Sequence, residues 1–483
     1  MPAVADFDAL QRSLAERLRG TTPEADAAAI VVCPSITFPV AELRKIVGIQ
    51  FYEERLLFLT LLLGNPGLQL LYPTSVPIDD SIIDYYLDWL PDPADARRRL
   101  HLFPVDDPEP SALTDKLLRR PDVLAAMVDR LTEPERSFIL PFNVTAAEAR
   151  LAAQLGIPIY GAHPDLVWLG SKSGARQVAV EAGVDVFVGA RDLHSLPAIE
   201  DAVEEIRRTR PDAEAVVVKL NHGFSGQGNV ILELDRVRRP LQTSPAVFCA
   251  AEESWSTFAP KVEAEGAIVE ELARGAGTVS PSVQVRILPG RRVEVVSTHD
   301  QILGGPDEQV YLGCRFPARA SYRARIQADA LAVANVLAAR GVVGSFGMDF
   351  VVVPHRGVFL SEINLRLGGT THPFLMARYV TGGEYKADSG QLFVDGAPRV
   401  YKSSDNIKSP RYIGLRPQQV IAAVAEAGLR YDPHTASGAT LHLLGALPAY
   451  GKYGLVSIAA TADEADVIYD RVLACVDALV GVQ

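Results

Sequence analysis

Residues 349–372, DFVVVPHRGVFLSEINLRLGGTTH, constrain the fold more strongly than any other stretch. DFVVV and VFLSEIN are rich in β-branched and aromatic residues, and PHRG between them carries the Pro and Gly of a turn, so a β-hairpin is predicted. A four-residue loop over 354–357 puts Asp349 opposite Glu362. Asn364, two residues further on, points to the same face as Glu362. Two carboxylates and an amide oxygen on one face suit Mg²⁺, and the alternative is a solvated face with ordinary acids.

Composition restricts the class of protein. The chain has 483 residues, of which 48% are hydrophobic and 22% charged, as in soluble globular proteins of about two to four domains. A net charge of −12 argues against nucleic acid and against an anionic membrane surface as partners. The N-terminus lacks the pattern of a signal peptide, and the four cysteines are far apart, which disfavours a zinc site or a disulfide framework. A cytoplasmic protein is expected.

The first part of the chain alternates strands with helices. Strands are predicted at 29–35, 68–72, 100–105, 137–142 and 157–161, and helices at 42–63, 81–90, 112–131 and 145–155. This alternation predicts a doubly wound parallel sheet that serves as a substrate-side domain. The apolar run 56–63 fits either a buried core helix or the interface of a homodimer.

Two lysines and a glycine-rich loop follow. A helix is predicted over 170–184 with Ser171 as its N-cap, and Lys172 lies in its first turn, where a cation is unfavourable unless an anion binds there. Lys219 ends an apolar strand, and a buried ammonium needs a partner. The loop 223–228, GFSGQG, leads into a second strand and not into a helix, so we interpret it as a flap over phosphates; the alternative is an ordinary hairpin loop.

Three further segments complete the pattern. The backbone groups of a strand that ends at Glu270 and Glu271 can pair with an adenine edge, although by itself the segment is an ordinary strand end. A hairpin around Gly290 exposes Gln284 and Arg286 on one face. After about residue 390 a helix–strand–strand–helix unit is predicted, which fits either a cap over the site or a contact for a peptide.

In this order, the features resemble those of the ATP-grasp superfamily over roughly residues 165–385. The runs YEERLLFL and DYYLDWLP and the tail LLGALPAYGKYGLVSIAATADEADVIYDR are similar to the pheganomycin-type peptide ligases of antibiotic biosynthesis. The resemblance implies an α/β, ATP-grasp fold. Its expected parts are an N-terminal doubly wound domain (1–168), a small lobe with the glycine flap (169–280), a central lobe with the metal site (281–390) and a small C-terminal α+β domain (391–483).

The resemblance also implies ATP and Mg²⁺ as cofactors, and it assigns roles to particular residues. Phosphates are expected at Lys172, Lys219 and the backbone of the flap, namely Gly223, Ser225, Gly226 and Gly228. Adenine is expected at Glu270 and at the main chain of Glu271 and Leu272. Mg²⁺ is expected at Asp349, Glu362 and Asn364.

The sequence departs from the superfamily pattern in two places. Gly277 and Thr278 stand where many members have a ribose-binding acid, so the ribose contact is unassigned. Gly347 stands where many members have an arginine two residues before the metal-binding Asp. The role of stabilising charge in the transition state is therefore expected of one of three other arginines, Arg286, Arg315 or Arg366.

The expected reaction joins an amino-acid-like carboxylate to the N-terminal amine of a peptide. A carboxylate must be activated before an amine can attack it, and phosphoryl transfer from ATP gives an acyl phosphate with release of ADP and then phosphate. Backbone amides in 367–371, including those of Gly368 and Gly369, are expected to hold the tetrahedral oxyanion. Three alternatives remain: a small-molecule kinase, an ATP-grasp ligase acting on amino acids instead of peptides, and a nucleotide-binding module without catalysis.

Overall fold

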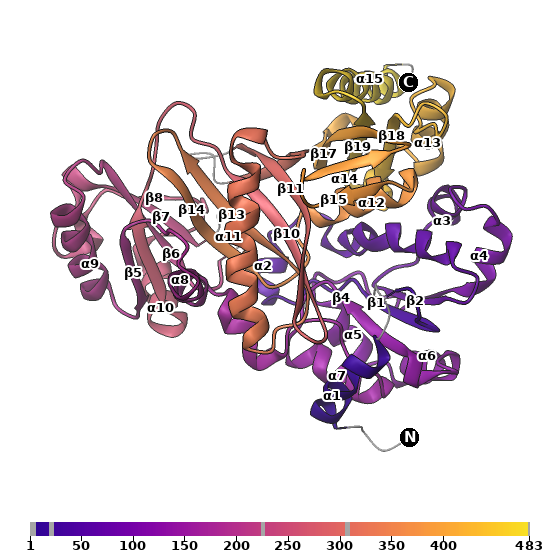
Figure 1. Cartoon of the computed structure of the whole chain (residues 1–483), viewed down its shortest axis with the longest axis horizontal. Helices are drawn as coiled ribbons and strands as arrows, with labels where there is room; N and C mark the ends of the chain where they lie inside the picture. Colours follow the sequence, from indigo (N-terminus) through magenta and orange to yellow (C-terminus); the bar gives the residue numbers. More distant parts are fainter. Residues whose placement is uncertain (1–5, 19–23, 224–227, 305–309, 482–483) are drawn as a thin grey trace.

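A computed structural model describes residues 6–18, 24–223, 228–304 and 310–481, which form an α/β structure of four parts (Figure 1). The N-terminal and C-terminal parts lie at one end of the molecule, and a smaller lobe lies at the other end, beyond the long central sheet. The predicted α/β class is confirmed. Ser225 and Gly226, which were expected over the phosphates, lie outside the described residues. Within the described ranges, every helix is too short or too polar to cross a membrane.

The N-terminal part contains a parallel sheet in the order β3-β2-β1-β4. Ile30 enters the core on one face of β1 and Val31 enters a different core on the other, so the sheet is covered on both sides, as predicted for a doubly wound domain. The predicted strand 157–161 contributes only a bridge, from Ile159 to Ile139. The strands are β1 (Ala29–Cys33), β2 (Gln69–Thr74), β3 (Leu100–Pro104) and β4 (Ser137–Pro141). The helices are α1 (Phe7–Arg17), α3 (Asp80–Leu87), α4 (Pro93–Arg99), α5 (Leu113–Leu118), α6 (Pro121–Arg130) and α7 (Ala146–Leu155).

The prediction of one continuous helix over residues 42–63 is wrong. A short helix, α2, covers Val40–Leu43, and a 3₁₀ helix, η1, covers Ile49–Gly64. Between them Gly48 has a φ of 71°, a left-handed conformation that ends a right-handed helix and is readily adopted by glycine. Most of residues 56–63 are buried in the core, so this apolar run packs inside the molecule and not against a second copy.

The small lobe holds an antiparallel sheet in the order β5-β9-β6-β7-β8. Helix α8 (Lys172–Glu181) begins as predicted, because the Oγ of Ser171 accepts a hydrogen bond from the N–H of Gly174 at 3.0 Å. In the hairpin that flanks the glycine loop, Lys219 pairs with Asn229. The remaining elements are β5 (Gly189–Leu193), α9 (Leu196–Thr209), β6 (Ala215–Leu220), β7 (Asn229–Glu233), β8 (Val247–Phe248), α10 (Trp255–Glu265) and β9 (Ala267–Glu271).

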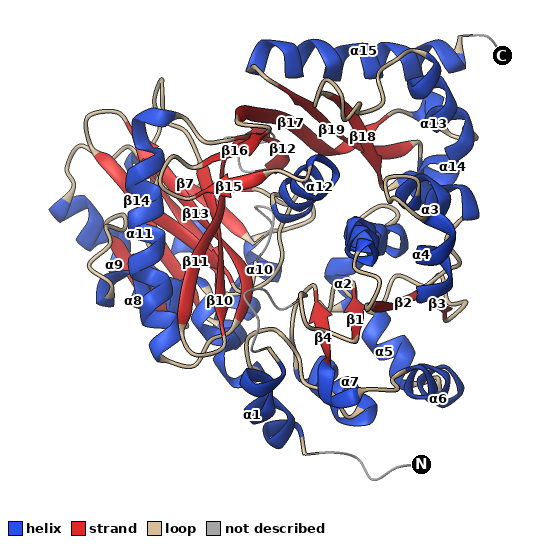
Figure 2. Ribbon diagram, turned by 45° about the vertical axis from the view of Figure 1, so that its right-hand side comes forward, coloured by secondary structure: helices blue, strands red, loops and turns tan. Residues whose placement is uncertain are grey.

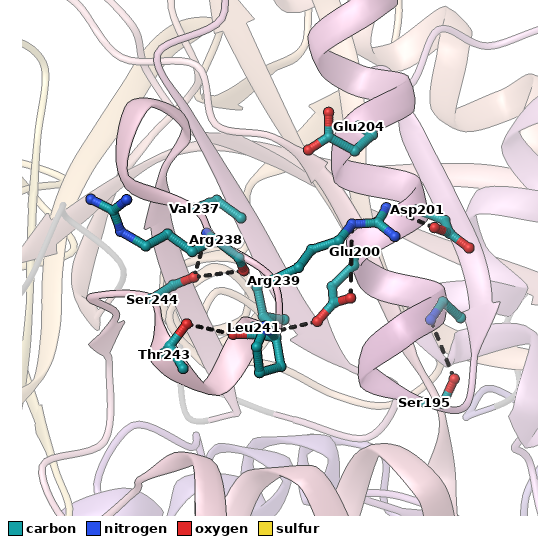
Figure 3. A network of polar contacts seen from close by, with 12 residues as sticks. Ser195, Glu200, Asp201, Glu204, Val237, Arg238, Arg239, Leu241, Thr243 and Ser244 are labelled. Carbon is teal, nitrogen blue, oxygen red and sulfur yellow. Dashed lines mark hydrogen bonds and ion pairs between the residues drawn. The ribbon is translucent and has the colours of Figure 1, made fainter.

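Polar contacts fix helix α9 to the loop over residues 237–244 (Figure 3). The N–H of Leu241 donates to Oε1 of Glu200 at 2.6 Å, and Arg239 pairs with Asp201 at 2.7 Å. This network therefore joins a helix to a loop of the same lobe and stabilises the lobe that carries Lys219.

The central sheet is antiparallel and follows the order β14-β13-β10-β11-β12-β17-β16-β15, with β19 joining β17 to β18. Helix α11 (Ala320–Ala339) packs against it, and Figure 1 shows this helix along β10 and β13. The strands are β10 (Pro281–Leu288), β11 (Arg292–Gly304), β12 (Val310–Phe316), β13 (Gly344–Val353), β14 (Gly357–Asn364), β15 (Glu384–Lys386) and β16 (Gln391–Val394).

The C-terminal part continues this sheet, because β12 pairs with β17. It also shares a hydrophobic core with the N-terminal part: Leu57 of η1 belongs to the same buried cluster as Tyr453 and Val472. Figure 2 shows the two parts next to each other. The elements are α12 (Thr371–Thr381), β17 (Ala397–Lys408), α13 (Pro417–Glu426), β18 (Gly438–His442), α14 (Leu447–Tyr450), β19 (Lys452–Ala459) and α15 (Ala462–Val480).

Candidate active site

A cavity of about 880 Å³ lies where the four parts meet. Each part contributes residues to its wall, among them Arg55, Lys219, Asp349 and Asp405. The cavity also contains most of the predicted site residues: Lys172, Lys219, Gly223, Glu270, Glu271, Leu272, Asp349, Glu362, Asn364, Arg366, Gly368 and Gly369 all line it.

The predicted acid pair is brought together by two irregularities that cancel. The turn between β13 and β14 is one residue shorter than expected, so Val353 pairs with Gly357. A β-bulge between the pairs Phe350–Leu360 and Asp349–Glu362 then restores the register. The expectation that Asp349 faces Glu362 is therefore confirmed, although the loop length on which it rested is wrong.

Hydrogen bonds orient the first acid of the pair. Asp349 accepts hydrogen bonds from Gln301 Nε2 at 2.7 Å and from Asn364 Nδ2 at 2.9 Å. Because the amide nitrogen of Asn364 faces Asp349, its oxygen is left for another partner. Burial, reinforced by the nearby Glu362 carboxylate, raises the pKa of Asp349 to about 7.

The second acid of the pair is matched by a lysine. Burial by itself would raise the pKa of Glu362, but the ammonium of Lys172, at 2.6 Å from its Oε1, lowers that pKa together with Arg366 and Lys219, and these cations outweigh burial. One carboxylate therefore tends to keep a proton while the other is ionised. A divalent cation between them would favour ionisation of both, and the oxygen ligands of Asp349, Glu362 and Asn364 are those that Mg²⁺ prefers. The residues present fit such an ion.

The two predicted phosphate-binding lysines both lie at this end of the cavity. Lys219 Nζ donates to Glu270 Oε1 at 2.5 Å and approaches Ser361 Oγ at 3.4 Å. Lys172 Nζ also donates to the carbonyl of Gly223 at 3.3 Å, which places the start of the flap beside it. Two buried cations near a glycine loop form an electrostatically favourable site for phosphates.

The predicted adenine segment has a more specific geometry than the sequence indicates. The carboxylate of Glu271 is held by Arg210 and Arg356, at 3.1 and 2.6 Å. The N–H of Leu272 donates to the carbonyl of Ala215 within the sheet, so only its carbonyl is left for a ligand. The predicted main-chain contact at Leu272 is therefore restricted to that carbonyl.

Thr278, at the position of the missing ribose-binding acid, lines the cavity. Its Oγ1 is buried and makes no hydrogen bond to any of the described residues. A buried hydroxyl without a partner usually marks a missing water or ligand, and a sugar hydroxyl is one group that would satisfy it. The sequence identified this position only as a departure from the superfamily.

Gln284 occupies the space that a side chain at Gly347 would enter. The two residues are paired across β10 and β13, and a Cβ on Gly347 would lie 2.8 Å from Gln284 Nε2. The amide of Gln284 donates to Thr370 Oγ1 at 2.7 Å and accepts from Thr371 Oγ1 at 2.8 Å. It therefore holds the glycine-rich loop that follows Arg366.

This loop retains two N–H groups for a ligand. The N–H of Leu367 donates to the carbonyl of Phe142, and the N–H of Gly368 donates to Thr371 Oγ1. The predicted oxyanion contact at Gly368 is thus unfavourable, because this donor is already used. Among the described residues, the N–H groups of Gly369 and Thr370 have no such partner, and both residues line the cavity.

Only one of the three expected arginines lies in the cavity. Arg366 lines it, with its guanidinium 5.6 Å from the ring centre of Phe38. Arg286 lies two residues beyond Gln284 on β10, about 7 Å further along, and donates to Glu294 at 2.7 Å. Arg315 is paired with Asp466 at 2.8 Å. Neither Arg286 nor Arg315 lines the cavity, so of the three arginines the structure favours Arg366 for contact with a reacting group.

Two family models match parts of the chain. The model described as IQCH-like, ATP-grasp matches residues 241–386, which include the acid pair. The model described as PGM1 C-terminal domain matches residues 419–472.

Several solved structures share this fold. A biotin carboxylase from Campylobacter jejuni in complex with a nucleotide aligns with a TM-score of 0.56 and 15% identity, covering 91% of this chain and 89% of that one. An N5-carboxyaminoimidazole synthetase from Staphylococcus aureus complexed with ADP aligns with a TM-score of 0.53 and 14% identity, covering 93% and 97%. At such identities the likeness concerns the fold alone, and it confirms the predicted ATP-grasp fold.

Two proteins of known description are similar in sequence. IQ motif-containing protein H of Danio rerio is 19% identical over 261 residues, covering 46% of this chain and 25% of that protein. The L-propargylglycine–L-glutamate ligase of Streptantibioticus cattleyicolor is 31% identical over 437 residues, covering 88% of this chain and 89% of that ligase. The chain therefore belongs to the family of this ligase, the pheganomycin-type ligases of the ATP-grasp superfamily.

Proposed function

We propose that the chain is an ATP- and Mg²⁺-dependent enzyme that joins the carboxylate of one amino-acid-like substrate to the amine of another, through an acyl phosphate, with release of ADP and phosphate. The main support is one juxtaposition. The acid pair of Asp349 and Glu362, the ammonium groups of Lys172 and Lys219 and the guanidinium of Arg366 line a single cavity. This is the charge pattern that phosphoryl transfer to a carboxylate requires.

The nucleotide would occupy the end of the cavity next to the small lobe. Glu270, Leu272, Thr278 and the two lysines line the cavity. Glu270 and the carbonyl of Leu272 would contact the adenine, Thr278 the ribose and the lysines the phosphates. Mg²⁺ would be held by Asp349, Glu362 and Asn364, and when bound it would neutralise charge on the transferring phosphoryl group. Lys172 would then exchange part of its contact with Glu362 for phosphate oxygens.

The chain's own residues would serve both half-reactions. In the first, a carboxylate oxygen attacks the terminal phosphorus of ATP and ADP leaves; Arg366 would hold the carboxylate in line. In the second, the amine attacks the acyl carbon, the phosphate departs with the electron pair of the bond that breaks, and the proton lost by the nitrogen leaves on the phosphate. The N–H groups of Gly369 and Thr370 would stabilise the oxyanion formed between these events. Exclusion of water by closure of the lobes would limit hydrolysis of the acyl phosphate.

The named relative favours an amino acid over a peptide as the acceptor. The resemblance to pheganomycin-type ligases predicts a peptide amine, whereas the relative that matches most of the chain is named for two amino acids. We therefore place the alternative of an amino acid–amino acid ligase first.

The proposal is tested by incubating the protein with ATP, Mg²⁺ and pairs drawn from the proteinogenic amino acids, L-propargylglycine and short peptides. ADP and phosphate should appear in equal amounts together with a condensed product detected by mass spectrometry. Formation of AMP and pyrophosphate would contradict the acyl-phosphate route. A stable phosphorylated acid that forms without an amine would instead indicate a kinase.

A further inference from the structure

Besides Arg366, three arginines line the cavity: Arg55, Arg274, which pairs with Glu233, and Arg319, which pairs with Asp300. Arg55 comes from η1 in the N-terminal part and donates a hydrogen bond to Oδ2 of Asp405, which comes from β17 in the C-terminal part. Arg55 and Arg366 interact electrostatically, as do Arg366 and the acids of the metal site. The cavity therefore presents one arginine beside the predicted metal and another beside Asp405.

Arg55 is held in place, but not all of its N–H donors have hydrogen-bond partners among the described residues. Its side chain is 13% exposed and that of Asp405 is 5% exposed, and the guanidinium carbon lies 4.3 Å from the ring centre of Tyr52. Its Nε is buried and has no hydrogen-bond partner among the described residues. Because a guanidinium carries five N–H donors, the pairing with Asp405 leaves donors for a further planar acceptor such as a carboxylate.

The charges around Arg55 do not balance. The ammonium of Lys452 donates to the hydroxyl of Tyr52, and although burial lowers the pKa of Lys452 to about 8, the group remains mostly protonated at neutral pH. Burial acts to raise the pKa of Asp405, but Arg55 and its other neighbours lower it to about 2, so Asp405 is ionised. Two cations thus face one anion in a largely desolvated site. An uncompensated buried charge is costly, so this site favours a bound anion.

The neighbouring histidines do not restore the balance. His372 and His442 are buried with their Nε2 atoms 3.1 Å apart. Burial lowers the pKa of His442 to about 4 and that of His372 well below its ordinary value, so both are neutral. The excess positive charge therefore stays with Arg55 and Lys452.

A ligase that joins two amino acids must distinguish two carboxylates, because one is activated and the other must remain intact. We propose that Arg55, positioned by Asp405, binds the intact carboxylate, which belongs to the amine substrate, and that this substrate is consequently a free amino acid. Arg366 then serves the carboxylate that is activated. This inference rests on the proposed ligase function and adds to it the residue that selects a free amino acid as the acceptor.

The unmodified protein gives the first test. With ATP, Mg²⁺ and the pair of amino acids that turns over best in the screen described above, the acceptor is replaced by its own carboxamide, which keeps the amine and the side chain but removes the negative charge. We expect kcat/KM for the carboxamide to fall at least ten-fold, with the KM for ATP unchanged.

Variants test the residue. In R55M the preference for the free acid over the carboxamide should disappear, mainly through a higher KM for the free acid, whereas R55K should retain part of it. R99M is the matched control, because Arg99 is similarly buried and paired with an aspartate, Asp95, in the N-terminal part but does not line the cavity. A structural role alone would lower activity with both acceptors equally.

The outcomes separate the two proposals. If no pair of substrates yields ADP, the ligase function and this inference fall together. If ADP forms but the carboxamide or a peptide extended at its carboxyl end serves as well as the free acid, the inference fails and the ligase function stands. Equal discrimination by R55M and the unmodified protein would also overturn the inference.

Discussion

The acid pair in the central hairpin shows how two identical functional groups acquire different properties. Asp349 is drawn toward the protonated form by burial and by its neighbour, whereas Lys172 keeps Glu362 ionised. A cation would remove this difference by favouring ionisation of both. The asymmetry is therefore a property of the metal-free hairpin, and removal of either acid should prevent metal binding.

Replacement of Glu362 by Gln tests this expectation. The substitution removes a charged ligand but little volume, so we expect kcat/KM to fall by roughly 100-fold or more while the melting temperature stays close to that of the unmodified protein. ADP release at several Mg²⁺ concentrations measures the effect. The control is Glu294→Gln, because Glu294 pairs with Arg286 and does not line the cavity. Unchanged turnover in Glu362→Gln would refute the metal site.

The arginines give a second prediction at this scale. Arg366→Met should lower kcat by about 10²- to 10³-fold, because the residue would contact developing charge inside a desolvated site. Arg315→Met should alter kcat by no more than a few-fold, since its guanidinium pairs with Asp466 outside the cavity. Steady-state rates of ADP formation distinguish the two. A larger loss in Arg315→Met than in Arg366→Met would reverse the assignment.

Single residues could be predicted only where neighbouring residues in the sequence indicate their role. Lys172 was identifiable because a cation at a helix N-terminus is locally unfavourable, and Asp349 and Glu362 because a hairpin joins them. Neighbouring residues in the sequence did not distinguish among the three arginines Arg286, Arg315 and Arg366. Arg55 and Asp405 were missed because they are separated by 350 positions, and neither has an unusual neighbour in the sequence.

At the scale of elements, the glycine-rich loop after β14 is shaped by what packs on it. A Cβ on Gly369 would lie 2.6 Å from Cε1 of Tyr311, whereas a Cβ on Gly368 would meet no atom within 4 Å. Tyr311 is partly buried and lines the cavity, and its hydroxyl bonds the buried thiol of Cys314, which limits how far the ring can move away. The first glycine therefore lies next to open space, and the second allows close packing against an aromatic ring.

A pair of alanine substitutions tests this difference through stability. Gly369→Ala should lower the free energy of unfolding by about 1–3 kcal/mol through overpacking, and Gly368→Ala should leave it nearly unchanged. Thermal or denaturant unfolding of the two variants, side by side, measures the effect without relying on activity. Equal melting temperatures would mean that Tyr311 yields to the added methyl group.

Helices and strands were predictable where capping or turn residues in the sequence mark their ends. Ser171 capped a helix, and the glycine loop separated two paired strands, as expected. The segment after residue 42 was not predictable in this way. Its apolar residues fit one continuous helix as well as two separate helices, and only the left-handed conformation of Gly48 divides it. The bulge in β14 also carries no obvious sequence signal.

At the scale of the whole molecule, the N-terminal and C-terminal parts pack together into one unit. They share a hydrophobic core, and β17 extends the central sheet across the boundary predicted near residue 390. Pairing between segments this far apart is set by tertiary packing, which local patterns do not record. The four predicted domain ranges remain predictions, and the joint between the first and the last of them is the place to probe.

Glu54 of η1 lies in that joint. It is buried, and its Oε2 accepts a hydrogen bond from the N–H of Gly445 in the C-terminal part at 3.0 Å. Burial raises the pKa of Glu54 to about 8, whereas in the unfolded chain a glutamate titrates near pH 4.3. Between these two values the folded protein retains a proton that the unfolded chain has lost. Stability should therefore decrease as the pH rises from about 5 to about 8, by at most about 1.4 kcal/mol per pH unit.

Glu54→Gln removes this titration while its amide oxygen still accepts from Gly445. Its melting temperature should match that of the unmodified protein near pH 5 and exceed it near pH 8, so the difference between the two proteins should grow with pH. Glu205→Gln, on the exposed face of α9, should leave the pH profile unchanged because that carboxylate is ionised in both states over this range. A difference that is constant between pH 5 and 8 would show that Glu54 is ionised in the folded protein and that the joint tolerates its charge.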